Sequence, residues 1–182
     1  GYTYEFEISP DNRYVAVKDG DSKSNFFLLS LDSMSYMLDY DYGRQHLGDS
    51  FQFAKNSSTL YVLDDSNLKI YDMIDSLWEQ NENTINLNGF CNPPTCNFGQ
   101  MDLTPNGSHL LLTTMESYED GGEDNYCGFS MLNLTSFQFD LNYDMTDRNR
   151  FGSCYVAPWI SSNSHGTQVF SLSGGYGVQI HN

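Results

Sequence analysis

Apolar and polar residues alternate with a period of two in several short segments of the chain. Residues 13–20 read RYVAVKDG, and similar segments are TLYVLDDS (59–66), HLLLTTME (109–116) and TQVFSLSG (167–174). Alternation over about four to eight residues predicts a strand with one buried face. Each segment follows a polar turn and a short apolar or aromatic run, which predicts a hairpin at each place.

The order of these segments recurs along the chain at intervals of roughly 50 residues. A third run follows as NFFLLSLDS (25–33), LKIYDMIDS (68–76) and GFSMLNLTS (128–136), and a fourth as YMLDYD (36–41), TINLNG (84–89) and FQFDLNYD (137–144). Residues 74–84 have room for a helical turn, but they are too short and polar to indicate a helical layer. We therefore expect four strands, A to D, in each repeated unit. The predicted units cover residues 1–46, 47–90, 91–148 and 149–182.

The turn between strands A and B has a recurring sequence, SPDN (9–12) and TPNG (104–107). These units resemble the degenerate β-propeller repeats with an SPDG-like turn, in the WD40/YVTN-like superfamily, although the Trp-Asp and Gly-His pairs of WD40 repeats are absent. The resemblance implies an all-β fold, a propeller-like array of about four four-stranded antiparallel blades in one domain over residues 1–182. It implies no activity. A β-sandwich is the alternative, because short strands with frequent turns also suit it.

The fourth unit is expected to be incomplete, because YGVQIHN (176–182) supplies strand C and no strand D follows. An unpaired strand edge is a liability that proteins normally cover. Three explanations are open: the missing strand lies in a longer polypeptide, residues 1–4 fill the gap, or a neighbouring chain adds a strand. The first is the plainest. The third would produce self-assembly by β-augmentation. Because the chain begins with Gly1, we expect a processed mature form, a fragment, or the ordered part of a longer polypeptide.

The composition narrows the possible partners. The chain has 182 residues, of which 24 are acidic and 8 are basic, and its formal net charge is −16. This charge repels nucleic-acid phosphates and anionic lipids. Because no apolar run reaches about 18 residues, membrane insertion is not expected either. The acidity suits cationic partners and Ca²⁺, although solubility alone would also account for it.

Three N-glycosylation sequons are present, at Asn56 (NSS), Asn106 (NGS) and Asn133 (NLT). In strands that run up and down, the A–B and C–D turns lie on one face of the array. All three sequons fall in such turns. We therefore predict a secreted or cell-surface protein that carries N-linked glycans on that face.

The chain contains four cysteines, Cys91, Cys96, Cys127 and Cys154, and their spacing matches no zinc-binding pattern. An even number of cysteines in a secreted protein predicts disulfide bonds. CNPPTC (91–96) could close a local loop, which would leave Cys127 to pair with Cys154. Other pairings stay open, because four cysteines allow three connectivities.

Acidic residues gather in the B–C turns, on the face opposite the sequons. The longest of these turns, residues 115–126, contains Glu119, Asp120, Glu123 and Asp124 as candidate Ca²⁺ ligands. The spacing is not that of an EF-hand. A solvated loop is the plainer interpretation of the cluster.

No catalytic motif stands out. His46, His109, His165 and His181 have no metal-binding pair spacing, and neither a Gly-x-Ser-x-Gly elbow nor a phosphate-binding loop occurs. We therefore expect a non-enzymatic, extracellular scaffold for structural or adhesive interactions, with protein partners or self-assembly, such as a subunit of a surface filament or appendage. The alternatives are a Ca²⁺-dependent binding module and the propeller domain of a larger secreted hydrolase.

Overall fold

The computed structural model describes eleven parts of the chain, which are residues 5–18, 25–41, 50–64, 66–75, 77–81, 84–87, 96–116, 125–144, 160–163, 168–173 and 177–181. All regular secondary structure in these parts is antiparallel β-strand, which confirms the predicted all-β class. Among these residues we find no helix with the length and apolar character needed to cross a membrane.

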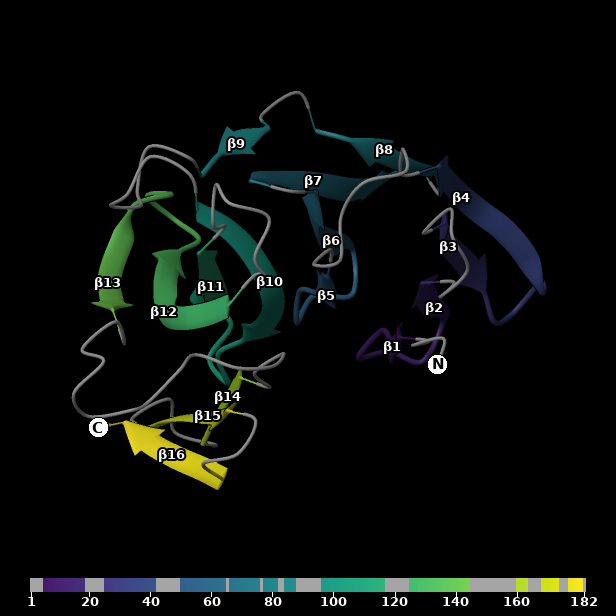
Figure 1. The fold of residues 1–182 in the computed structure, drawn as a ribbon. Helices are drawn as coiled ribbons and strands as arrows, with labels where there is room; N and C mark the ends of the chain where they lie inside the picture. Colours follow the sequence, from purple (N-terminus) through teal and green to yellow (C-terminus); the bar gives the residue numbers. More distant parts are fainter. Residues whose placement is uncertain are drawn as a thin grey trace.

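The strands form four sheets that follow one another along the chain (Figure 1). Sheet 1 consists of β1 (Glu5–Ile8), β2 (Tyr14–Lys18), β3 (Asn25–Ser30) and β4 (Ser35–Asp41). Sheet 2 consists of β5 (Phe51–Phe53), β6 (Thr59–Asp64), β7 (Asn67–Ile74) and β8 (Leu77–Gln80), with β9 (Ile85–Asn86) also paired to β7. Sheet 3 consists of β10 (Cys96–Leu103), β11 (His109–Glu116), β12 (Asn125–Asn133) and β13 (Phe139–Asp144). Sheet 4 consists of β14 (Ile160–Ser162), β15 (Val169–Ser173) and β16 (Gly177–His181).

The outer part of sheet 2 differs from the sequence-based expectation. The segment considered for a helical turn contains strand β8, and the expected strand D contributes only the short β9. Trp78 explains the difference, because its ring packs edge-on against Tyr14 at 5.5 Å and against Phe53 at 6.1 Å. A strand leaves Trp78 buried while Leu77 and Glu79 face outward. Burying so large a ring stabilises the strand more than local polarity opposes it.

The first strands of the sheets lie next to one another in chain order. Strand β1 contacts β5, β5 contacts β10, and β10 contacts β14. The sheets therefore follow an arc, with later strands farther from its inner side (Figure 1). Apart from β9, which pairs with β7, the strands within each sheet are neighbours in chain order, so each sheet is built by hairpins.

Two apolar cores fill the spaces between successive sheets. The core between sheets 1 and 2 consists of Tyr14, Ala16, Leu28, Phe51, Phe53, Leu60, Val62, Tyr71 and Trp78. The core between sheets 2 and 3 consists of Leu63, Leu68, Leu87, Phe98, Met101, Leu110, Leu112 and Leu132. Burial of a large aliphatic or aromatic side chain contributes roughly 1.5–3 kcal/mol. Face-to-face packing of the sheets is therefore the main source of stability in the described part of the chain.

Carboxylates on two first strands connect neighbouring sheets. Glu7 on β1 accepts hydrogen bonds from the Gln52 side chain and, at 3.0 Å, from the backbone N–H of Phe53 on β5. Asp102 on β10 accepts equivalent hydrogen bonds from the Ser161 hydroxyl and the backbone N–H of Ser162 on β14. The same contact therefore occurs between sheets 1 and 2 and between sheets 3 and 4.

Candidate functional site

The A–B turns of sheets 1, 2 and 3 have the same geometry. The first turn residue donates its backbone N–H to the carbonyl five positions later, at 2.9 Å for Ser9, 2.8 Å for Ala54 and 3.0 Å for Thr104. The fourth turn residue is left-handed, with φ of 60° at Asn12, 59° at Ser57 and 73° at Gly107. Gly and Asn adopt this region at low cost, which accounts for their places in TPNG and SPDN.

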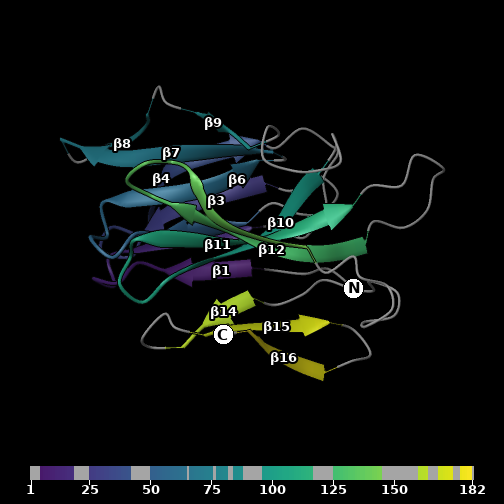
Figure 2. The same cartoon turned by 90° about the vertical axis from the view of Figure 1, so that its left-hand side faces the viewer.

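These turns lie side by side. The backbone N–H of Asp11 donates to the Ser57 hydroxyl at 3.0 Å, and the Lys55 side chain lies against Gly107. Figure 2 shows the β1–β2, β10–β11 and β12–β13 turns at the same end of the sheets. We call the surface made by residues 9–13, 54–58, 104–108 and 134–138 the turn face.

Two of the sequon asparagines are exposed on the turn face, Asn56 and Asn106. The side-chain oxygen of Asn56 accepts the backbone N–H groups of Ser58 and Thr59, at 3.0 and 3.2 Å. That of Asn106 accepts the backbone N–H of Ser108 at 3.1 Å. In both residues the turn uses the amide oxygen, whereas a glycan is attached to the amide nitrogen. The amide nitrogen of Asn56 also donates to Thr59 Oγ1, at the longer distance of 3.4 Å. Both turns can therefore keep their oxygen contacts when the asparagine is glycosylated.

The third sequon residue, Asn133, has a different environment. Its side chain is half-buried, and its oxygen accepts the backbone N–H groups of Thr135 and Ser136 at 2.9 and 3.1 Å. Its amide nitrogen donates to Asp140 Oδ2 at 3.1 Å. Because both ends of the amide are engaged, a glycan at Asn133 would have to fit around the contact with Asp140.

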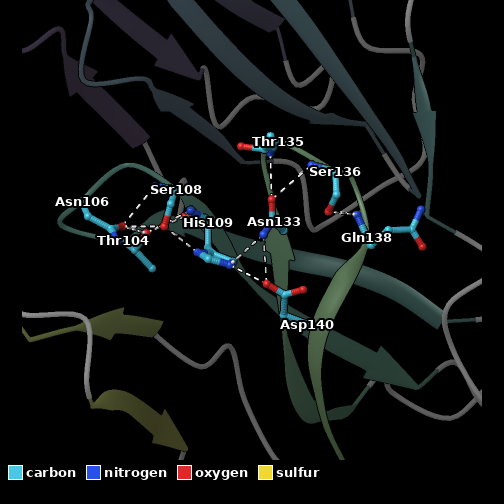
Figure 3. A network of polar contacts seen from close by, with 9 residues as sticks. All are labelled: Thr104, Asn106, Ser108, His109, Asn133, Thr135, Ser136, Gln138 and Asp140. Carbon is cyan, nitrogen blue, oxygen red and sulfur yellow. Dashed lines mark hydrogen bonds and ion pairs between the residues drawn. The ribbon is translucent and has the colours of Figure 1, made fainter.

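A chain of polar contacts joins the turn residues around Asn133 (Figure 3). Ser108 Oγ lies 2.6 Å from His109 Nδ1, and His109 Nε2 lies 2.7 Å from Asp140 Oδ2. The Ser108 hydroxyl also donates to Asn106 Oδ1 at 2.8 Å. The network therefore connects the A–B turn with the C–D turn of the same sheet.

Asp140 is the acceptor at one end of this network. Nε2 of His109 lies 2.7 Å from Asp140 Oδ2 and 3.4 Å from the amide nitrogen of Asn133. The hydrogen bonds from Asn133 and His109 hold the pKa of the Asp140 carboxyl below its ordinary value. The Asp140 contact is therefore a charge-assisted hydrogen bond at an exposed carboxylate.

Serine, histidine and aspartate are also the residue types of a hydrolytic triad, but their geometry here differs from the triad template. In the template the aspartate contacts Nδ1 of the histidine and the serine contacts Nε2, and here the two nitrogens are exchanged. Ser108 also lies within the tight turn, where Asn106 holds its hydroxyl. We interpret the network as a structural link that fixes the turn face.

The predicted Ca²⁺ ligands Glu119, Asp120, Glu123 and Asp124 lie outside the described residues, so the Ca²⁺ hypothesis stays a prediction. Within the residues that the structure describes, no group of three or more His, Cys, Asp or Glu side chains is placed to hold a metal ion.

The backbone limits the possible disulfide pairings. Cys91 and Cys154 lie outside the described residues, whereas Cys96 begins β10 and Cys127 lies in β12. Strand β11 separates β10 from β12 and pairs with both. Two strand spacings place their Cα atoms about 10 Å apart, beyond the roughly 7 Å limit for a disulfide. This removes one of the three connectivities, the one that joins Cys96 to Cys127.

The sequence predicted the turns that contain the sequons but not the contacts that connect them. It indicated no metal-binding spacing for His109, and nothing in it singled out Asp140. The only available signal is the strand register, because antiparallel pairing of β11 with β12 places His109 opposite Asn133.

No protein-family model matches this chain, and no curated protein matches it. Among solved structures, hydrazine synthase from Kuenenia stuttgartiensis is similar with a TM-score of 0.61 and 14% identity, over 96% of this chain and 51% of that chain. A functionally unknown protein from Desulfotomaculum acetoxidans DSM 771 is similar with a TM-score of 0.65 and 11% identity, over 97% of this chain and 50% of that chain. At these identities the likeness concerns the fold alone. The chain spans about half the length of either structure.

Proposed function

We propose that this chain is a secreted, N-glycosylated β-propeller module that acts as an extracellular scaffold for structural or adhesive interactions. One observation carries the proposal. The sequon residues Asn56 and Asn106 are both exposed on contacting A–B turns, with their amide oxygens used by the turn. An attached glycan at either position would project from the turn face without disturbing the sheets.

Several features support the propeller arrangement. Apart from β9, each sheet has its strands in chain order, and the first strands lie next to one another. Successive sheets bury apolar faces against each other, as propeller blades do. The similar solved structures are about twice as long as this chain, so the four sheets would form about half of a comparable assembly.

The turn face also supports a scaffold role. Backbone hydrogen bonds fix its turns, and the contacts of Asp11 with Ser57 and of His109 with Asp140 connect them. A surface that is ordered before it meets a partner loses less conformational entropy on binding. Such a surface suits protein partners, and the net charge of −16 favours partners with a basic patch.

The glycans provide the test. The chain is produced in a eukaryotic secretory system with an added leader, and its intact mass is measured with and without an endoglycosidase. We expect the unmodified chain to carry glycan mass. Asn56→Gln and Asn106→Gln should each lose the mass of one N-linked glycan. Asn86→Gln is the matched control, because Asn86 is exposed and belongs to no sequon.

A secreted product without glycan at Asn56 and Asn106 would overturn the extracellular proposal. The same samples are treated with a thiol reagent, with and without reductant. The added mass reports how many cysteines are free thiols and how many form disulfides. Four free thiols in the secreted protein would also contradict it, because the secretory pathway oxidises paired cysteines.

A further inference from the structure

The register of the first two strands defines equivalent positions in the sheets. Ile8 pairs with Val15 in sheet 1, as Phe53 pairs with Leu60 in sheet 2. Phe6 pairs with Val17 in the same way that Phe51 pairs with Val62. Residues directly opposite each other in an antiparallel pair share a face of the sheet. These four pairs therefore occupy the same face in the two sheets.

This face is buried in sheet 2 and exposed in sheet 1. Phe51 and Phe53 are 4% and 1% exposed, because they pack against sheet 1. Phe6 and Ile8, at the equivalent positions, are 69% and 47% exposed. The same row in sheet 3 is again largely buried, with Leu110 at 0% and Leu103 half-buried. Sheet 1 thus presents the face that sheets 2 and 3 use to pack against the sheet before them.

The exposed face of sheet 1 is mostly apolar from β1 to β4, and the register places one acidic position on it, Asp39 opposite Phe27. Continuing the register, Val17 pairs with Phe27 and Val15 with Leu29, and Leu29 pairs with Tyr36. The Phe27 and Tyr36 rings lie 5.8 Å apart, and Tyr36 is 69% exposed. We call this surface the open face and define it by Phe6, Ile8, Val15, Val17, Phe27, Leu29 and Tyr36. Contiguous apolar surfaces of this kind mark interaction sites.

The other end of the array carries the complementary type of face. In sheet 4, Phe170 pairs with Ser161 and Ile180, and Leu172 pairs with Val178. By register Phe170 is equivalent to Ala16, which lies on the face that sheet 1 turns toward sheet 2. Positions 170, 172, 178 and 180 therefore share the face of sheet 4 that points onward along the arc. We call it the end face.

We infer that the open face binds the end face of a second copy of this chain. The two face types are those that pack together in the core between sheets 1 and 2. Two copies joined at both ends would contain eight sheets, within the range of about four to eight known for propellers. Their combined length would match that of the similar solved structures, of which one chain covers about half. A head-to-tail contact of this kind forms a closed ring when its rotation closes.

The inference names a partner for the proposed scaffold and depends on its blade arrangement, but not on glycosylation. The mass of the 182-residue chain in solution is measured by light scattering over a range of concentrations. We expect a dimer. Ile8→Asp places a charge in the apolar contact and should raise the dimer dissociation constant by at least about 100-fold.

Ile74→Asp is the matched control, because Ile74 is 51% exposed and lies on β7, away from the open face. We expect it to form dimers like the unmodified chain. Circular dichroism and thermal melting verify that both variants are folded. Exposed positions are chosen so that the charge is introduced without disturbing a core.

A second pair of measurements tests the head-to-tail direction. Phe170→Asp alone should be monomeric, because the end face is changed in both copies of the dimer. A mixture of Ile8→Asp and Phe170→Asp should form a heterodimer through its one intact contact. A dimer that joins two open faces would instead persist in Phe170→Asp, and this result would overturn the inference.

Three other results would also overturn it. These are a monomeric unmodified chain at high concentration, an Ile8→Asp variant that forms dimers as well as Ile74→Asp does, and an open ladder of larger oligomers. A deglycosylated or never-glycosylated chain that still forms the dimer would separate this inference from the extracellular proposal. A glycosylated chain that stays monomeric would reject the inference and leave the extracellular proposal standing.

Discussion

The carboxylate of Glu7 accepts the backbone N–H of Phe53 at 3.0 Å, across a separation of 46 residues in the chain. This contact joins β1 to β5 beside the apolar core between sheets 1 and 2. Glu7→Ala would leave the N–H without its acceptor, and we expect the free energy of unfolding to fall by about 1.5–3 kcal/mol. Urea denaturation measures the loss.

Glu79→Ala serves as the control for this variant, because Glu79 is an exposed glutamate on β8. We expect it to change the free energy of unfolding by no more than about 0.5 kcal/mol. Glu7→Gln keeps an acceptor oxygen, so its free energy of unfolding should lie between those of Glu7→Ala and Glu79→Ala. Equal stabilities of Glu7→Ala and Glu79→Ala would show that the contact contributes nothing.

Gly107 is left-handed, with φ of 73°, at the position where the first turn has Asn12 with φ of 60°. An L-residue in this region costs about 1–2 kcal/mol, and asparagine tolerates it better than alanine. A Cβ at Gly107 would lie 3.2 Å from Lys55 Cδ, which is flexible and can move aside. We therefore expect Gly107→Ala to be less stable than Gly107→Asn in thermal melts. The reverse order would mean that the left-handed backbone conformation does not determine the difference between the two variants.

Asp140 makes the stability of the turn face depend on pH. Hydrogen bonds from Asn133 and His109 lower the pKa of Asp140 in the folded state. Its contribution to stability is therefore present above the pKa of the unfolded state and is lost as the pH falls through the folded value. We expect Asp140→Asn to lower the melting temperature at pH 6 but to have a smaller effect at pH 2.5. The effect should be small, because Asp140 is exposed and solvent screens its charge. A difference that grows as the pH falls would contradict this assignment.

Asp102 should show the opposite pH dependence. Burial raises the pKa of its carboxyl, although hydrogen bonds from Ser161 and from the N–H groups of Leu103 and Ser162 partly offset the shift. A raised folded pKa means that stability is greatest below the unfolded pKa and declines as the pH rises through the folded value. Asp102→Asn cannot ionise, so we expect its melting temperature relative to the unmodified chain to be higher at pH 7 than at pH 3. A pH-independent difference between the two proteins would exclude ionisation as the cause.

The sequence predicted most strands of the described part because their signals are local. Alternation around Val15 and Leu60 and the turns at SPDN and TPNG need only neighbouring residues. The same reasoning was wrong at residues 77–80, where polar neighbours hid a strand. Trp78 holds that strand in place through Tyr14, which lies in another sheet, so no local pattern could have predicted it.

The contacts of the candidate site could not be predicted from the sequence either. His109 and Asp140 are 31 residues apart, and their pairing depends on the register of three strands. The sequons at Asn56, Asn106 and Asn133 are identical as motifs. Only their surroundings separate the two exposed asparagines from the half-buried Asn133, whose amide nitrogen donates to Asp140.

By itself, the sequence determined the alternation of each strand and the turns that join it to the next, because both follow from neighbouring residues. Phe6 and Phe51 show what it left open, since each is an aromatic residue on the first strand of its sheet. Tertiary structure alone decided that Phe51 is buried and that Phe6 is exposed. The reason is that burial depends on whether another sheet packs on that face. The sequence of the strand does not determine whether a neighbouring sheet is present there.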